Sequence, residues 1–142
     1  MYCSLNTASC RKGITISVLA AIIFLIVGLL FRGYCPASKA ASPWYRIFIH
    51  NLVFAGTITL LTSLLEVAGI LLVSSTIGFT MFTCGRAIAC GSLSALLVAL
   101  LETIAYMLAY VVAFVRTRWR ITLTCFMLVV LLVASIVESQ AT

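Results

Sequence analysis

Long apolar runs separated by short polar segments dominate the pattern of this chain. The first run, residues 14–31, is free of charged side chains and lies between Arg11-Lys12 and Arg32. At about 1.5 Å per residue, a helix of this length nearly crosses the hydrocarbon core of a bilayer, which is about 30 Å thick. The pattern predicts an uncleaved transmembrane helix here.

The rest of the chain holds enough apolar sequence for three further helices. A polar connection with both prolines follows the first run, and Trp44 and Tyr45 at its end are typical of a membrane interface. Serine, threonine and glycine at 74–78 predict a turn that extends to Arg86, and a basic segment at 116–120 predicts a tight loop. The predicted helices cover residues 14–31, 49–73, 87–115 and 121–137.

Composition supports a surface that faces lipid. Hydrophobic residues make up 64% of the chain and charged residues 8%, whereas soluble domains carry about 25% charged residues. The basic residues lie in short clusters beside the apolar runs, as headgroup anchors do, and no nucleic-acid-binding pattern accompanies them. We therefore predict an all-α integral membrane protein with a single domain, residues 1–142, of four transmembrane helices in a compact bundle with short loops. The expected partners are the lipid bilayer and other membrane subunits or further copies of the chain, with no nucleic acid.

The distribution of basic residues predicts an orientation. With four spans, one face carries Arg11, Lys12 and Arg86, and the other carries six bases. Because cytoplasmic loops are enriched in Lys and Arg, both termini are predicted to be extracytoplasmic. The cysteines near that face could then form a disulfide in an oxidising compartment. These cysteines are Cys3, Cys10, Cys84 and Cys90.

Two glutamates, Glu66 and Glu102, are the charged residues that fall inside predicted helices. The segments around them, 59–72 and 95–108, share the pattern L-L-x-x-L-L-E. A carboxyl at such depth costs about 2.5–3.5 kcal/mol on insertion scales, so it is expected to face the bundle interior. In an antiparallel hairpin the two carboxyls would lie at similar depth and could share a proton.

Polar neighbours at helical spacing extend this candidate site. Tyr106 and Tyr110 follow Glu102 at four-residue intervals, and Thr62 precedes Glu66 by four residues, so each set shares one helix face. Hydroxyl groups around a carboxyl suit a proton or cation path, and they equally suit a hydrogen-bonded structural carboxyl. Both readings remain open at this stage.

A stripe of small residues in the predicted third helix suggests close helix packing. Its members repeat every four residues, and they are Ala87, Gly91, Ala95 and Ala99.

The sequence favours a structural role over an enzymatic one. It shows no nucleophile–base pattern, no phosphate loop and no C-x-x-C pair, so we expect no enzyme activity, no cofactor and no metal site. The leading hypothesis is a structural subunit or scaffold of a membrane complex or viral envelope. The alternative is a small proton- or cation-linked transporter or channel that uses Glu66 and Glu102.

Overall fold

The computed structural model describes residues 7–31, 42–115 and 117–141, and within these ranges it is entirely helical. Five helices are present, so the all-α class is confirmed, whereas the predicted number of four is wrong. In chain order they are α1 (Thr7–Leu30), α2 (Trp44–Leu64), α3 (Glu66–Ala89), α4 (Ser94–Val112) and α5 (Thr117–Ala141).

The extra helix arises because the predicted second helix, 49–73, is broken at Leu65. This residue has an extended backbone, with φ −140° and ψ 91°, and α3 begins directly after it. Gly69 lies against Thr62 so closely that a Cβ atom on Gly69 would overlap the threonine side chain. The missing side chain therefore allows the chain to reverse direction without a loop.

The predicted turn at 74–86 is helical and belongs to α3. Two of its hydroxyls donate to carbonyl groups of their own helix: Ser75 Oγ to Leu72 O at 3.0 Å, and Thr83 Oγ1 to Thr80 O at 2.9 Å. Polar side chains that bond within the helix do not need water, so their turn-like composition does not end the helix. The chain turns later, at residues 90–93, which reduces the predicted third helix, 87–115, to α4.

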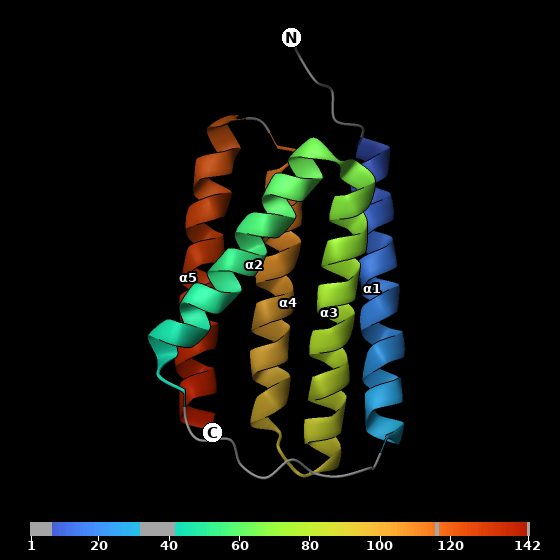
Figure 1. Ribbon diagram of the computed structural model, residues 1–142, viewed down its shortest axis with the longest axis vertical. Coiled ribbons are helices and arrows are strands. Elements are labelled where there is room, and N and C mark those ends of the chain that lie inside the picture. The colour runs from blue at the N-terminus through green and yellow to red at the C-terminus, as the bar shows by residue number, and fades with distance from the viewer. Residues whose placement is uncertain (1–6, 32–41, 116, 142) are drawn as a thin grey trace.

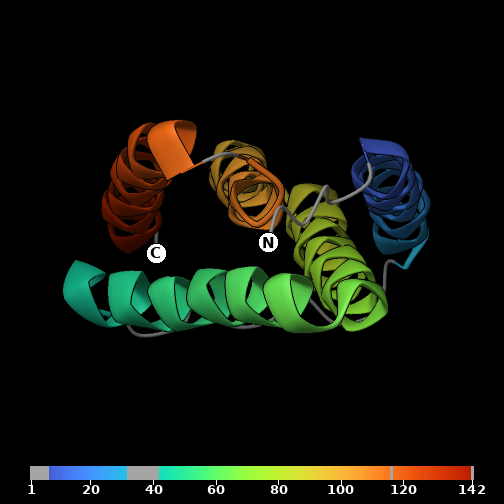
Figure 2. The ribbon, with the colours of Figure 1, turned by 90° about the horizontal axis from the view of Figure 1, so that it is seen from above.

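The helices form a row of four with one helix laid across it (Figures 1 and 2). α5, α4, α3 and α1 stand roughly side by side, and α2 crosses diagonally over one side of α5, α4 and α3. The core includes the fully buried side chains of Ile58, Ile77, Tyr110 and Leu131, one from each of α2, α3, α4 and α5.

α1 is held mainly by α3. Ser17 Oγ and Ser74 Oγ are 3.0 Å apart in a hydrogen bond between the two helices. A Cβ atom on Gly85 would lie 2.5 Å from Leu25 O, and one on Gly28 would overlap Phe82 O. Glycines at both positions therefore let the two backbones approach closely, as in other membrane helix pairs.

All five helices are long and apolar enough to cross a membrane. Large apolar side chains are exposed on their outer faces, among them Ile23, Leu71 and Val129. The chain is therefore a multi-pass membrane protein, as predicted.

The first residues of α1 and the last residues of α5 lie at opposite ends of the molecule (Figure 1), because the number of helices is odd. This arrangement does not fit the prediction that both termini lie on the same side.

Candidate functional site

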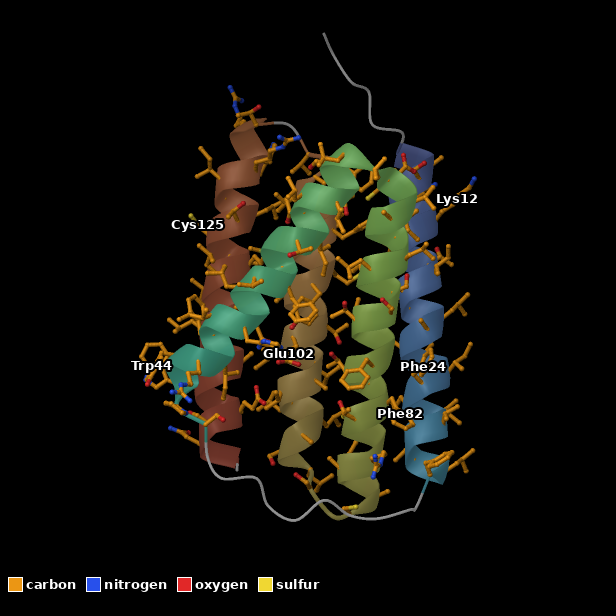
Figure 3. All side chains as sticks on the ribbon, viewed as in Figure 1. Lys12, Phe24, Trp44, Phe82, Glu102 and Cys125 are labelled. Atoms are coloured by element: carbon orange, nitrogen blue, oxygen red, sulfur yellow. The ribbon has the colours of Figure 1, made fainter. Side chains whose placement is uncertain are left out.

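The best-defined polar group inside the bundle is the carboxyl of Glu102, about midway along the molecule on α4 (Figure 3). Asn51 Nδ2 on α2 donates to Glu102 Oε1 at 2.8 Å, and Tyr106 OH donates to Asn51 Oδ1 at 3.1 Å. Asn51 and Tyr106 are buried, with 4% and 3% of their surfaces exposed. Asn51 thus holds the carboxyl and Tyr106 holds Asn51, and such chains strengthen each member bond.

Glu102 also borders open space. A cavity of about 820 Å³ lies between α2, α3, α4 and the end of α5, and Glu102, Asn51 and Tyr106 are part of its wall. A second cavity of about 250 Å³ continues from it toward the connection between α3 and α4, where Ser92 and Ser94 line it. We refer to the two together as the cleft.

The wall of the cleft is unusually polar for a membrane-spanning region. The polar side chains of the larger cavity are Ser42, Arg46, His50, Asn51, Ser75, Thr76, Thr80, Thr83, Glu102, Tyr106 and Glu138. Thr80, Thr83, Glu102 and Glu138 also line the smaller one. Because unpaired polar groups are costly in hydrocarbon, this clustering marks the cleft as the candidate functional site.

Glu138 is the second carboxyl of the site, in place of the predicted Glu66. It lies near the end of α5 and lines both parts of the cleft. The carboxyls of Glu102 and Glu138 therefore border the same space. The sequence did not indicate this pair, because the predicted fourth helix ended at residue 137.

Glu66 lies elsewhere. It is the first residue of α3, at the end of the bundle where α2 meets α3, and it lines neither part of the cleft. The structure therefore does not bring Glu66 and Glu102 together at one depth, and the repeat between 59–72 and 95–108 has no counterpart in the fold. A negative charge in the first turn of a helix is stabilised by the helix dipole, which accounts for Glu66 there.

The other predicted site residues divide between two places. Tyr106 belongs to the cleft, whereas Tyr110 OH donates to Ser9 O on α1 at 3.2 Å and ties α1 to α4. Thr62 Oγ1 donates to Ile58 O within α2 at 2.7 Å. Tyr110 and Thr62 therefore have structural contacts near the end of the bundle that holds Glu66.

The predicted packing stripe does not run along one helix. Ala87 is in α3, and Ala95 and Ala99 are in α4, and these three line the smaller part of the cleft. Gly91 lies in the turn between the helices, with φ 90° and no atom near the position of a Cβ. Its role is conformational, because side chains are strained at such a φ.

Several residues of the site were not singled out by sequence reasoning. Asn51 and His50 interrupt an apolar run, and such polar interruptions are the signal that could have identified them. Arg46 has the pattern of a headgroup anchor, which concealed its place in the cleft wall.

The described residues contain no cluster of three or more His, Cys, Asp or Glu side chains that could hold a metal ion. What the arrangement offers instead is a fixed carboxyl beside accessible space, which can accept a proton or pair with a cationic group.

Comparison with known proteins finds no matching family model, no similar curated protein and no similar solved structure.

Proposed function

We propose that this chain is a small membrane transporter that binds a proton or another cation at Glu102. The observation that supports this most is the position of the Glu102 carboxyl, which Asn51 holds at 2.8 Å in the wall of a cavity of about 820 Å³. A purely structural carboxyl would be expected to lie in close packing, because hydrogen-bonding neighbours are all that it needs. Cavities of this size are typical of ligand sites.

The path of a cation would follow the polar wall. Thr76, Thr80 and Thr83 lie on α3 at helical spacing and line the cavity with Glu102, and their hydroxyl oxygens can replace part of the water around a cation. Asn51 orients the carboxyl through the bond that it donates, and Tyr106 fixes Asn51 in turn by donating to its Oδ1. We assign Glu102 the role of binding residue, and Asn51 and Tyr106 the role of positioning residues.

A second candidate is the structural subunit that the sequence favoured. α1 supports it, because this helix packs mainly against α3 and leaves much of its apolar surface exposed, including Leu19, Ile23 and Ile26. A partner helix could cover that surface, and lipid could do so equally well. The cleft has no evident purpose in this second role.

Ion flux through reconstituted protein separates the two candidates. Purified full-length chain is placed in liposomes that contain a pH-sensitive dye, and the internal pH is followed after an external pH step, with sodium or potassium gradients as parallel tests. We expect flux from the wild type and at least a tenfold loss in Glu102→Gln, because the amide cannot release a proton or pair with a cation. Glu66→Gln is the matched control and should retain wild-type flux, since Glu66 lies outside the cleft.

Folding of each variant is checked by circular dichroism and size-exclusion chromatography in detergent. A folded Glu102→Gln protein with wild-type flux would exclude Glu102 as the binding residue. A wild type without flux in any gradient, purified in fixed ratio with another membrane protein, would favour the structural subunit.

We further propose that the N-terminal end of α1 faces the cytosol and the C-terminal end of α5 faces the outside. Of the described basic residues, Arg11, Lys12, Arg118 and Arg120 lie toward the end that holds the α1 N-terminus, and Arg46 and Arg86 lie toward the other end. Cys90, at the second end, is disulfide-bonded, which favours an oxidising compartment there. Alkaline phosphatase fused to the C-terminus should then be active in a bacterial host, and an inactive but stable fusion would reverse the orientation.

A further inference from the structure

We propose that the cleft binds a small organic zwitterion, with its ammonium group at Glu102 and Glu138 and its anionic group at Arg46. This inference rests on the proposed function, because it names the substrate class of the same cleft.

The size of the cleft points to an organic molecule. A volume of about 820 Å³ falls within the range of small-molecule sites, about 300–1,000 Å³. A bare metal ion needs far less space and several ligands at short distances, and the described residues provide no such cluster. A molecule with several heavy atoms therefore fits the site better than a metal ion does.

The carboxyls and rings of the cleft suit an ammonium group. Glu102 and Glu138 contribute carboxyls, and the aromatic rings of Phe54, Phe79 and Tyr106 line the same cavity. Ammonium groups bind favourably both to carboxylates and to the faces of aromatic rings. Acid side chains combined with aromatic rings favour an organic ammonium over an inorganic cation.

The part of the wall at the start of α2 suits an anion. Arg46 lies in the first turn of α2 and lines the cavity, five residues before Asn51, which is about 7.5 Å along a helix. The N-terminus of α2 has no side-chain cap, so the positive end of its dipole also favours an anion. His50, one turn further along, lines the same wall and can donate a hydrogen bond.

Opposite charges therefore line one cavity. A ligand with a single positive charge would make no favourable contact with Arg46, whereas a carboxylate or phosphate attached to the ammonium group would pair with it. Arginine binds both groups through two parallel hydrogen bonds, so either anion satisfies the geometry.

Two sources can supply this chemistry. Ser75 and Phe79, in the α3 part of the wall, are exposed side chains of a helix long and apolar enough to cross a membrane, so the cavity is open along α3 within the membrane-spanning region. A phosphate–ammonium zwitterion can therefore be a free solute or the headgroup of a phospholipid. The charges that recognise it are the same in both cases.

Equilibrium dialysis of three radiolabelled probes against the purified full-length protein in detergent, at low salt, tests the proposal. The probes are phosphoethanolamine, which carries both charges, ethanolamine, which carries the ammonium alone, and inorganic phosphate. We expect phosphoethanolamine to bind at least tenfold more tightly than either fragment, because a charge-assisted hydrogen-bonded pair contributes about that factor or more. Equal binding of ethanolamine and phosphoethanolamine would overturn the proposal.

Matched variants assign the two ends of the ligand. Arg46→Gln should bring phosphoethanolamine down to the affinity of ethanolamine, while Lys12→Gln, which removes a cation at the other end of the bundle, should not change either affinity. Arg46 is exposed, so its replacement is expected to leave the fold intact, which circular dichroism verifies. A folded Arg46→Gln protein that keeps the full preference would also overturn the proposal.

The outcomes separate this inference from the proposed function. If ethanolamine binding requires Glu102 and the phosphate of phosphoethanolamine adds no affinity, the cation site of the proposed function stands and the zwitterion proposal is rejected. Absence of binding by every probe would reject the zwitterion, while the flux assay judges the cation site independently. Repeating the dialysis in nanodiscs identifies the source of the ligand. If a lipid headgroup occupies the cleft, phosphatidylethanolamine should displace phosphoethanolamine and phosphatidylglycerol should not. If the ligand is a free solute, neither lipid should displace it.

Discussion

Replacing Asn51 with leucine would remove the centre of the hydrogen-bond chain that positions Glu102. Asn51 donates to Glu102 at 2.8 Å and accepts from Tyr106 at 3.1 Å, so leucine deprives two groups of a partner at once. Side-chain hydrogen bonds between membrane helices contribute about 0.6 kcal/mol on average and up to about 1.7. Buried groups left without a partner cost about 1–3 kcal/mol each in soluble proteins. We therefore expect Asn51→Leu to lower the free energy of unfolding by about 1–3 kcal/mol.

Two further variants provide a comparison for the expected loss of unfolding free energy in Asn51→Leu. Tyr106→Phe removes only the outer bond of the chain and should cost about half as much. Thr57→Val is the control, because the Thr57 hydroxyl is exposed and bonds to Val53 O in its own helix, so a change within about 0.5 kcal/mol is expected. Reversible unfolding in mixed micelles with increasing dodecyl sulfate, followed by circular dichroism, supplies all three values. Stability of Asn51→Leu equal to that of the wild type would refute the reasoning, since it would mean that the chain contributes nothing to the fold.

Glycine and threonine positions allow further predictions with the same unfolding assay. Gly85→Ala should destabilise the protein by about 1–3 kcal/mol, because the new Cβ atom would lie 2.5 Å from Leu25 O, a rigid backbone atom. Gly56→Ala is its control and should be neutral or stabilising by up to about 1 kcal/mol, since open space surrounds that position. Gly91→Ala should cost about 1–2 kcal/mol for its φ of 90°, and Gly91→Asn should cost less, because asparagine tolerates positive φ. An equal cost for both would show that the positive φ is not the cause of the loss. Thr59→Val should cost about 0.6 kcal/mol through loss of the bond from Thr59 Oγ1 to Ala109 O, at 2.9 Å between α2 and α4, and an unchanged stability would show that the bond contributes nothing.

Local sequence was sufficient to identify the class of this protein. A run such as 14–31 can bury its backbone polar groups in lipid only as a helix, and this requirement depends on nothing elsewhere in the chain. The same reasoning selected Glu102 as a residue of interest, because a carboxyl among apolar side chains needs a polar partner. Both conclusions follow from the cost of placing polar groups in hydrocarbon.

The break at Leu65 could not be predicted in this way. Residues 47–64, which precede the break, contain no proline and no Asp, Glu, Lys or Arg. The serines and threonines of 74–80 are more typical of a turn than the residues around Leu65 are. What ends α2 is a close contact, with Gly69 against Thr62, and such a contact exists only once the two helices are packed. This one break changed the number of helices, and with it the relative positions of the two termini.

The partners of Glu102 were likewise decided by tertiary structure. Asn51 is 51 residues away in sequence, and Glu138 lies at the far end of the chain. The hydropathy of a segment indicates which residues lie inside the membrane. It carries no information on which other helix faces a given side chain. The diagonal course of α2 over α4 supplies that information, because it brings Asn51 to Glu102 and leaves Glu66 at the end of the bundle.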